Sequence, residues 1–427
     1  MHNEIKNLPD EVQDILVTVS RVAASLDSRI YIVGGVVRDF LLKRNVTDLD
    51  IVVEGDAIRL AQEVAENIGA EFKRHHAFGT ATITLGSNKI DFATARKEVY
   101  PKPGALPKVE PADMHNDMMR RDFTINAMAI SLNHMDYGRL IDHHGGVNDL
   151  HAHTIKILHD KSFIDDPTRI LRAIRFEQRF GFKLERKTLQ ALNDAVKAKA
   201  FETVHPHRLR DEIILILKEP RPFEYIKRVE EVVGWGVIIG DKKLKLSKDE
   251  LILLHNIETT MHDEGFRLSR FRSLDAWLIY LMAILVKLDI KAIKRFVETF
   301  DFKKGERIRL ITAKEYLNTV KKISGEVKPH VIYRILNPLS FETILFLYIY
   351  TGDGTVRKNI ENFMTTMVNA KLKVGGADLK AIHVKPEALF GKILDNLLDA
   401  KLDKGFSTRQ EEMVEAGRIY AKMSKGK

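Results

Sequence analysis

The first third of the chain alternates between helical and strand-like hydrophobic patterns. Within residues 1–28, apolar side chains recur every three or four positions, for example at Val12, Leu16 and Val19, which predicts an amphipathic helix. Four short β-rich runs bounded by glycine or polar turns follow: RIYIVGG, LDIVVEG, ATITLGS and KIDFATA. Helical patterns such as AIRLAQEVAENIG separate some of these runs. We therefore predict a small domain of helices and strands over residues 1–150.

From about Phe163 to the C-terminus, the spacing of apolar positions is helical. Glycines and prolines interrupt it in segments such as KEPRP, LNPLS and KVGGAD, which are typical of breaks between helices. The pattern predicts an all-α remainder with divisions near residues 220 and 370. We accordingly expect the chain to have four parts: 1–150, 151–220, 221–370 and 371–427.

Length and composition narrow the class of protein. At 427 residues the chain is too long for one ordinary hydrophobic core, so several domains are expected. It has no cysteine, which excludes disulfides, thiolate metal sites and thiol nucleophiles. The net charge of +9 favours a polyanionic partner. Because the sequence contains no secretory segment or long apolar run, we expect a cytoplasmic protein without a membrane partner.

Two aspartates, Asp48 and Asp50, stand just before the apolar run at residues 51–53. In an extended strand residues i and i+2 point to the same face, so their carboxylates repel unless a cation lies between them. Mg²⁺ prefers such oxygen ligands. Asp91, in the run KIDFATA, could complete a three-carboxylate cluster that holds two ions roughly 3.5–4 Å apart. We predict catalytic roles for Asp48, Asp50 and Asp91, with Asp48 and Asp50 as metal ligands, although such a pair alone also fits a strand edge.

A glycine pair and an arginine precede these aspartates. Gly34 and Gly35 lack side chains, so their backbone N–H groups can approach a triphosphate closely. Arg38 follows at a distance that lets its planar guanidinium reach the same phosphates. The order strand, Gly-Gly, Val-Arg-Asp, helix, Asp-x-Asp, strand therefore predicts a metal beside a bound nucleotide.

The segment GGVVRDFLL…TDLDIVV resembles the first motif of the class II tRNA nucleotidyltransferases and of the related bacterial poly(A) polymerases. RRDFTINAMA resembles their second motif, and DDPTRILRAIRFEQRFGF resembles their nucleobase-recognition motif. HRLRDEI and the C-terminal segment extend the likeness over nearly the whole chain. The resemblance implies an α+β head of the DNA polymerase β nucleotidyltransferase superfamily, followed by an all-α neck, body and tail.

The resemblance also implies ligands and partners. It predicts Mg²⁺ as cofactor, ATP and CTP as substrates, and the 3′ end and acceptor stem of tRNA as partner, with the tail (residues 371–427) binding tRNA. The segments ARKEVYPKPGALPKVEP and DDPTRILRAIRFE are most similar to the catalytic half of longer bacterial members. The resemblance therefore leaves open a fusion to further N-terminal domains in the native protein.

The third motif has a physical interpretation of its own. Asp166, Arg169, Arg172 and Arg175 recur every third residue along a predicted helix, and all four are predicted nucleotide ligands. A carboxylate accepts hydrogen bonds and a guanidinium only donates them. Such a pair matches the donor and acceptor edges of cytosine and adenine, whereas guanine and uracil present the reverse order. In the family this role belongs to the aspartate and the first arginine, here Asp166 and Arg169. A capping aspartate beside a solvated basic face is the alternative.

The second motif places Arg120, Arg121 and Asp122 before an apolar run. We predict that these residues contact the ribose and phosphates of the nucleotide. The resemblance favours Arg121 and Asp122 as ligands, whereas Arg120 also fits a polar entrance to a helix.

Together these features predict template-independent, Mg²⁺-dependent addition of C and/or A to the tRNA 3′ end, with release of pyrophosphate. Addition of A only, and poly(A) synthesis on other RNA 3′ ends, are the alternatives. Addition of C only is disfavoured because the loop between the first two motifs, residues 96–119, has the full length seen in the other family members. A catalytically inactive RNA-binding protein of the same fold is a further, different hypothesis.

Overall fold

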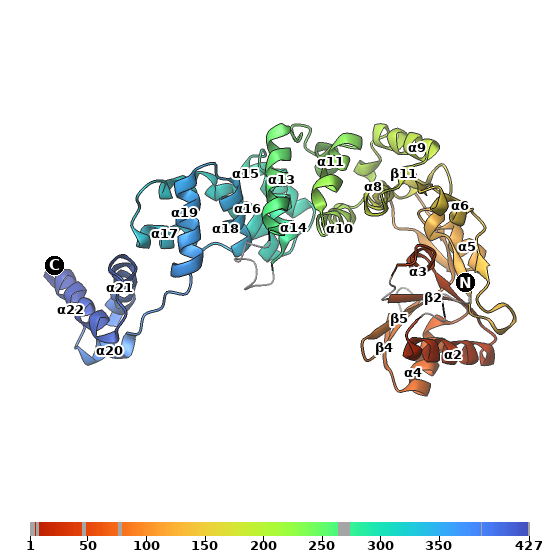
Figure 1. Ribbon diagram of the computed structural model, residues 1–427, viewed down its shortest axis with the longest axis horizontal. Coiled ribbons are helices and arrows are strands. Elements are labelled where there is room, and N and C mark those ends of the chain that lie inside the picture. Colours follow the sequence, from red (N-terminus) through yellow and green to blue (C-terminus); the bar gives the residue numbers. More distant parts are fainter. Residues whose placement is uncertain are drawn as a thin grey trace. The chain divides into compact units, whose positions relative to one another are not determined.

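The computed structural model describes residue 5 and residues 8–44, 48–75, 79–263, 274–385 and 387–425 (Figure 1). Within these ranges, the side chain of Asp48 also lies outside the description. The chain divides into two units, Met1–Glu212 and Ile213–Lys427. The four-part division predicted from the sequence stays a prediction.

A seven-stranded mixed sheet organises the first unit, with strand order β3-β4-β5-β2-β1-β8-β9. Strands β2 and β5 pair in parallel, and the other neighbours pair antiparallel. The strands are β1 (Arg29–Val33), β2 (Asp48–Glu54), β3 (Glu71–His75), β4 (Thr80–Leu85), β5 (Asn88–Thr94), β8 (Ala129–Ser131) and β9 (Leu140–Ile141). A separate hairpin consists of β6 (Arg96–Val99) and β7 (Lys108–Pro111).

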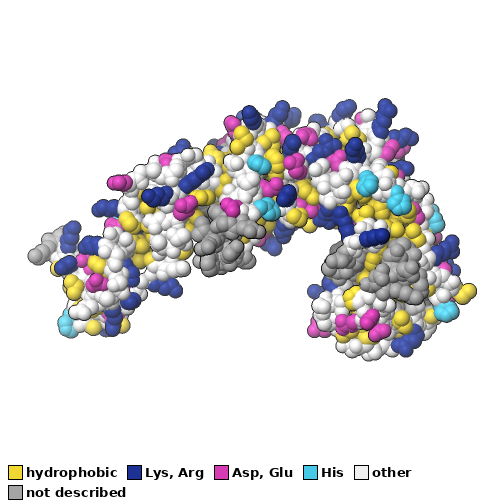
Figure 2. Space-filling model, viewed as in Figure 1, with side chains coloured by type: hydrophobic (Ala, Val, Ile, Leu, Met, Phe, Trp, Pro, Cys, Tyr) yellow, Lys and Arg dark blue, Asp and Glu magenta, His cyan; other side chains and the backbone are white. Residues whose placement is uncertain are grey.

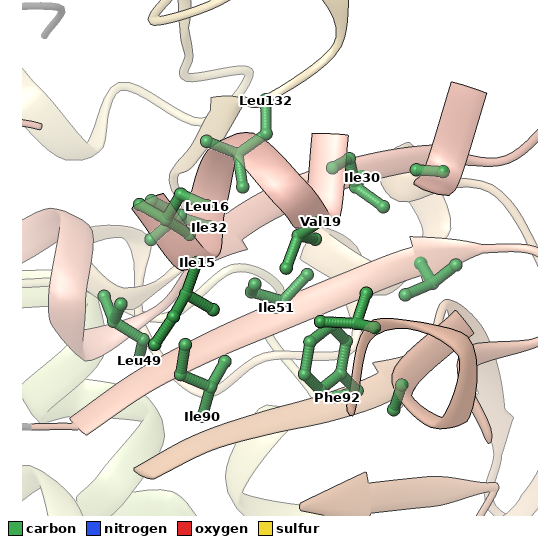
Figure 3. Close-up of a cluster of buried hydrophobic side chains, with 14 of the residues drawn as sticks. Ile15, Leu16, Val19, Ile30, Ile32, Leu49, Ile51, Ile90, Phe92 and Leu132 are labelled. Atoms are coloured by element: carbon green, nitrogen blue, oxygen red, sulfur yellow. The ribbon is translucent and has the colours of Figure 1, made fainter. Parts of the chain in front are cut away.

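Helices α2 (Asp10–Ser25) and α4 (Ala57–Ile68) supply apolar side chains to the core on one face of this sheet (Figure 3). Helix α4 begins where the side chain of Asp56 accepts two backbone N–H groups, and it ends at Gly69 in the left-handed conformation. Leu49 and Ile51 of β2 point into this core. Because side chains alternate along a strand, Asp50 faces the opposite side of the sheet.

Short helices connect the strands of this unit, and two of them pack on the sheet: residues 35–41 add to the core that contains α2 and α4, and residues 114–119 pack on the opposite face. The short helices are α3 (Gly35–Leu41), α5 (Met114–Met119), the 3-10 helices η2 (Thr124–Asn126) and η3 (His134–Asp136), and α6 (Gly146–His151). The segment that follows contains β10 (Thr154–Ile155), α7 (Ser162–Asp165), α8 (Thr168–Phe180), β11 (Lys183–Leu184), α9 (Arg186–Lys197), η4 (Ala200–Thr203) and α10 (Pro206–Leu217). Strands β10 and β11 pair in parallel.

The second unit is helical. Its most apolar helices, α14 and α18, are almost entirely buried and form part of its core. The elements are α11 (Pro222–Val232), α12 (Trp235–Ile239), α13 (Lys248–His262), α14 (Ala276–Leu285), α15 (Ile290–Thr299), α16 (Lys304–Thr319), η6 (Val320–Ile323), α17 (Pro329–Leu336), α18 (Phe341–Tyr350), α19 (Gly354–Asn362), η7 (Phe363–Met367), α20 (Gly376–Ala381), η8 (Glu387–Leu389), α21 (Phe390–Lys404) and α22 (Arg409–Lys425). Helices α20 to α22 enclose a hydrophobic cluster of their own around Leu379, Ile393 and Leu397.

The predicted fold class, an α+β head followed by a helical remainder, is confirmed. The four β-rich runs became β1, β2, β4 and β5, and the predicted first helix became α2. In the described part of the chain no single helix is long and apolar enough to cross a membrane. A pair bent by 116°, Pro329–Leu336 with Phe341–Tyr350, meets the same test of length and composition.

Candidate active site

A polar cleft of about 480 Å³ lies in the first unit, and every predicted nucleotide-binding residue lines it. Of the predicted carboxylates, Asp50 lines it too. Its walls come from the β1–α3 turn, β2, the β6–β7 hairpin, the second motif and α8. The lining residues are Gly34, Gly35, Arg38, Asp50, Glu98, Tyr100, Arg120, Arg121, Asp122, Asn126, Asp166, Arg169, Arg172, Arg175, Phe176 and Arg179.

Asp50 and Asp91 are direct neighbours on the parallel strands β2 and β5. The same register places Leu49 beside Ile90, both in the buried core. Neighbouring residues in register share a face of the sheet, so Asp50 and Asp91 lie on the face away from that core. The sequence prediction of two acidic strands side by side is therefore matched by the strand pairing.

The surroundings of Asp91 differ from those of Asp50. Thr82 Oγ1 donates a hydrogen bond of 2.5 Å to Asp91 Oδ1, and Lys89 Nζ lies 2.6 Å from Asp91 Oδ2. Among the side chains that the structure describes, no three histidines, aspartates or glutamates are placed to hold a metal ion. The exposed carboxylate of Asp50 suits a hard divalent cation in kind. The roles of Asp48, Asp50 and Asp91 stay predictions.

Two arginines pack against the glycine turn between β1 and α3. Gly34 has φ +70° and ψ −131°, a conformation that other residues rarely adopt. A Cβ atom on Gly34 would lie 2.7 Å from Nη1 of Arg121, and one on Gly35 would lie 3.2 Å from Nη2 of Arg38. The absence of side chains at Gly34 and Gly35 thus leaves room for the guanidinium groups of Arg121 and Arg38 at the cleft.

Arg38 is only 6% exposed, and all three of its guanidinium nitrogens donate hydrogen bonds to neighbouring side chains. Its Nε and Nη2 donate to the two carboxylate oxygens of Asp39 at 3.0 and 2.9 Å. Its Nη1 donates to Oδ1 of Asn126 at 2.6 Å. A buried cation needs such partners, and together they fix the guanidinium plane at the wall of the cleft.

A buried aspartate that the sequence interpretation missed organises the second motif. Asp117 on α5 is fully buried and pairs with Arg120 at 2.7 Å and with Arg121 at 2.9 Å. Burial alone would raise the pKa of Asp117, but Arg121 and Arg120 hold that pKa below its ordinary value. The spacing i, i+3 and i, i+4 in the sequence was the signal that could have revealed these pairs.

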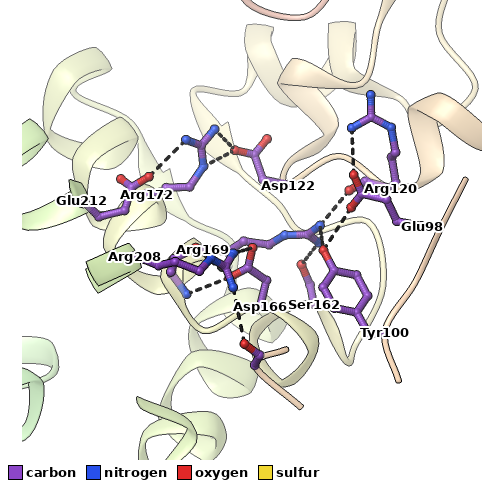
Figure 4. Close-up of polar contacts among 12 residues, drawn as sticks. Glu98, Tyr100, Arg120, Asp122, Ser162, Asp166, Arg169, Arg172, Arg208 and Glu212 are labelled. Atoms are coloured by element: carbon purple, nitrogen blue, oxygen red, sulfur yellow. Dashed lines mark hydrogen bonds and ion pairs between the residues drawn. The ribbon is translucent and has the colours of Figure 1, made fainter. Parts of the chain in front are cut away.

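Arg172 joins the second motif to α10. It pairs with Asp122 at 2.6 Å and with Glu212 at 3.4 Å (Figure 4). Glu212 also pairs with Arg175 at 3.4 Å. Burial alone would lower the pKa of Arg172, but Asp122 and Glu212 raise it above the ordinary value. Asn126 Nδ2 donates to the other oxygen of Asp122 at 2.9 Å. Three motifs far apart in the sequence are therefore tied by one ionic network.

Asp166 caps the start of α8 and pairs across to α10. Its Oδ1 accepts from the N–H and the hydroxyl of Thr168, at 3.2 and 2.6 Å. Its Oδ2 lies 2.8 Å from Nη2 of Arg208 (Figure 4). From the sequence we interpreted Asp166 and Arg169 as the pair that recognises the base. In the structure, the ionic partner of Asp166 is Arg208.

Arg169 is fixed by three oxygens around the cleft (Figure 4). It donates to Ser162 Oγ at 2.8 Å, to the carbonyl oxygen of Arg120 at 2.7 Å and to the hydroxyl of Tyr100 at 3.4 Å. Burial raises the pKa of Tyr100 to about 12, so its phenol stays protonated and donates to Glu98 at 3.1 Å. The β6–β7 hairpin thereby contributes to the wall beside Arg169.

The sequence interpretation did not assign these hairpin residues, nor several others that line or support the cleft. HRLRDEI had been singled out as a motif, and it contains Arg208. The hairpin segment ARKEVYPKPGALPKVEP was matched to the family only as a whole, because Glu98 and Tyr100 gain their roles from contacts with distant residues. The unassigned residues are Glu98, Tyr100, Asp117, Phe176, Arg179, Arg208 and Glu212.

The chain is similar to known proteins over most of its length. A sequence model described as the Poly A polymerase head domain matches residues 30–156. The A-adding tRNA nucleotidyltransferase of Geobacter sulfurreducens is 33% identical over 98% of this chain, and the chain spans 48% of that protein. The protein of the same name from Halalkalibacterium halodurans is 33% identical over 97% of this chain and 93% of its own length. The structure titled Thermotoga maritima CCA-adding enzyme complexed with tRNA_CCA shares 29% identity and a TM-score of 0.76, covering 97% of both chains.

Proposed function

Since the chain belongs to the tRNA nucleotidyltransferase family, we propose that it adds C, A or both to the 3′ end of tRNA, using CTP and ATP and releasing pyrophosphate. One observation carries this proposal: every predicted nucleotide ligand, and Asp50 with them, lines a single cleft in the first unit. Core packing alone gives no reason for five separate segments to converge with so many charges.

The cleft provides for each part of a nucleoside triphosphate. Arg38 and Arg121 stand at the glycine turn, where donors and positive charge suit the phosphates. Asp50 lies on the adjacent strand, at the position proposed for a metal ligand. Mg²⁺ held there by Asp48 and Asp50 would activate the RNA 3′-hydroxyl and neutralise charge on the phosphates. The protein residues act by positioning the triphosphate and by stabilising its charge, without a covalent intermediate.

Base selection is assigned to the start of α8. Asp166 supplies an acceptor and Arg169 supplies a donor, and both line the cleft. This order matches the Watson–Crick edges of cytosine and adenine and opposes those of guanine and uracil. Because Arg169 is fixed by three other oxygens, its direction toward the base does not depend on the ligand.

The tRNA is proposed to contact the helical unit through its phosphates. Lysine and arginine side chains are spread along this unit, interspersed with acidic ones (Figure 2). The net charge of +9 is consistent with a polyanionic partner read by charge and shape. The assignment of the tail to tRNA binding, like the cytoplasmic location, stays a prediction.

Addition of A alone is a second candidate, because the two curated relatives described above carry the name A-adding. Poly(A) synthesis remains the more distant alternative, suggested by the name of the matching head-domain model. Transcripts of one tRNA lacking CCA, and of the same tRNA ending in CC, incubated with CTP alone, ATP alone or both, separate these activities. A CCA-adding enzyme completes both RNAs, an A-adding enzyme extends only the second, and a poly(A) polymerase adds many A residues.

The Asp50→Ala variant tests whether the protein is an enzyme at all. We expect loss of nucleotide incorporation with tRNA binding retained, because the substitution removes a carboxylate from an exposed position in the cleft. Unchanged turnover in Asp50→Ala would contradict the proposed site, and a wild-type protein that binds tRNA but incorporates no nucleotide would identify an inactive RNA-binding protein.

A further inference from the structure

An aromatic ring near the end of the third motif, to which the sequence interpretation gave no role, lies against Arg38 of the first motif and against Arg44. Phe180 is the last residue of α8, and its ring centroid lies 4.6 Å from Cζ of Arg38 and 4.8 Å from Cζ of Arg44. Both separations are within the range of a cation–π contact. The sequence offers no reason to pair positions so far apart, and Phe180 is not among the residues that line the cleft.

Phe180 is the nearer of two aromatic rings against the guanidinium of Arg38, with Phe176 at 5.6 Å, and the two rings add to its polar contacts. Asp39 and Asn126 hold the N–H groups in the plane of the guanidinium, and Gly35 provides the gap beside Nη2. The face of a phenyl ring attracts a cation and excludes water from it, so the ring resists rotation of the guanidinium out of this plane. The ring contact and the planar hydrogen bonds are therefore complementary restraints.

The ring itself belongs to a row of aromatic side chains. Phe180 stacks on Phe176 with centroids 5.8 Å apart and an interplanar angle of 16°, and it lies 5.5 Å from Phe182. Phe176 in turn meets the fully buried Phe123 edge to face at 5.8 Å. Since Phe123 follows Asp122 directly, this row runs from the second motif to the end of α8. The position of Phe180 is thus set by packing and does not depend on a ligand.

We propose that Phe180 is a positioning residue for nucleotide binding: it holds Arg38 against the Gly34–Gly35 turn and so ties the turn that faces the triphosphate to α8, the helix that carries Arg169 and begins just after Asp166. This inference rests on the proposed function, because it assumes that Arg38 contacts the phosphates. Phe180 acts through Arg38 and does not touch the nucleotide.

The binding experiment compares Phe180→Leu and Phe180→Tyr with the wild type, using calorimetry with ATP and CTP and no RNA. Leucine keeps the apolar contact but lacks a π face, so we expect nucleotide affinity to fall roughly 5- to 10-fold. Tyrosine keeps the face and restores affinity. Phe223→Leu is the matched control, because Phe223 is also half-buried and packs against His255 in the other unit. Equal affinity in wild type and Phe180→Leu would overturn the inference.

Two further readouts distinguish positioning from general loosening of the fold. In the Arg38→Gln background, Phe180→Leu should cause no additional loss of affinity, since the residue through which it acts has been removed. An additive loss would overturn the inference. In steady-state assays the KM for nucleotide should rise while kcat and the KM for tRNA change little, whereas a loosened fold would affect all three.

A ligand-free measurement separates this inference from the proposed function. In protein labelled with ¹⁵N-arginine, the Nε–H resonance of Arg38 should carry a ring-current shift that is reduced in Phe180→Leu, where only the more distant ring of Phe176 is left, and that persists in Phe180→Tyr. If wild-type protein binds neither ATP nor CTP, the proposed function fails while this measurement still tests the ring contact. If Arg38 shows no shift between wild type and Phe180→Leu, the contact itself is refuted whatever the protein binds.

Discussion

Gly34 and Arg121 lie so close together that a methyl group at Gly34 would stand 2.7 Å from Nη1 of Arg121. Arg121 has little freedom to withdraw, because Asp117 holds its Nη2 at 2.9 Å and the carbonyl oxygen of Asn126 accepts from its Nη1. The backbone of Gly34, at φ +70°, independently disfavours any L-residue. Conformation and crowding therefore both require glycine at this position.

Gly34→Ala should reduce kcat/KM for nucleotide addition about 10-fold or more, because moving Arg121 by an ångström disturbs binding of the phosphates. Steady-state kinetics with a tRNA acceptor measures this. Gly69→Ala is the control: Gly69 also has a positive φ, +67°, but nothing lies within 4 Å of its Cβ position. That variant should lose about 1 kcal/mol of stability and keep its activity. Equal kcat/KM values for the two variants would contradict the proposed role of Arg121 in binding the phosphates.

The sequence predicted those strands whose own residues form a recognisable β-rich, apolar run. Strand β2 was found because LDIVVEG is a short β-rich run that ends at a glycine, and its apolar residues Leu49, Ile51, Val52 and Val53 are all buried. Strand β3 was missed because EFKRH contains one apolar residue, Phe72, among polar ones, and no residue of this edge strand is fully buried. The hairpin strand RKEV was missed for the same reason.

The same distinction holds in the candidate site. The glycine turn and the acidic strand were recognised because the glycine pair, Arg38 and the two aspartates all lie within one short segment, in an order that suits nucleotide and metal binding. The partnership of Asp166 with Arg208 joins residues 42 positions apart, and that of Arg172 with Asp122 joins residues 50 apart. Charge alone cannot assign such partners among 68 basic and 59 acidic residues, because only the packing of α8 with α10 and with the second motif decides which ones meet.

The pairing of Asp122 with Arg172 predicts a pH-dependent contribution to stability. Burial alone would raise the pKa of Asp122, but Arg172 and Asn126 hold it below the ordinary value. A lowered pKa means that the contribution is complete above the unfolded-state pKa, about 4, and is lost as the pH falls through the folded-state value. Asp122→Asn should therefore cost about 2 kcal/mol at pH 7 and progressively less below pH 4.

Urea unfolding followed by circular dichroism at pH 7 and pH 3 measures this difference. Asp160→Asn serves as the control, because Asp160 is exposed and its substitution should change the free energy of unfolding by less than about 0.5 kcal/mol at either pH. A deficit of Asp122→Asn that is the same at both pH values would show that the pair does not titrate as described.

Glu412 should be essential for the fold of helices α20 to α22. It is fully buried, pairs with Lys401 at 2.6 Å, and accepts the backbone N–H groups of Lys373 and Val374 at 2.7 and 3.0 Å. Glu412→Ala leaves these groups without their acceptor and should destabilise this part by about 3–5 kcal/mol. Limited proteolysis should then cleave within residues 371–425, while ATP binding to the first unit is unchanged.

Glu387→Ala provides the comparison for Glu412, since Glu387 is 66% exposed at its side chain and pairs only loosely with Lys380, at 3.3 Å. Its proteolysis pattern should match that of the wild type, because exposed pairs contribute about 0–1 kcal/mol. If both variants are cleaved alike, the buried acceptor is not what holds these helices together.

Asp166→Asn should weaken the choice of C and A over G and U. The amide replaces one accepting oxygen with a donor and releases Arg208, so the cleft no longer opposes a base whose edge carries the reversed pattern. Because one mismatched hydrogen-bonding pair costs about 1–3 kcal/mol, incorporation of UTP or GTP relative to the cognate nucleotide should rise about 10-fold or more in single-turnover assays. Asp165→Asn is the matched control, since the neighbouring carboxylate is similarly buried but faces His159 at 4.0 Å and does not line the cleft. Loss of selectivity in Asp165→Asn, with Asp166→Asn unaffected, would place base recognition at the end of α7.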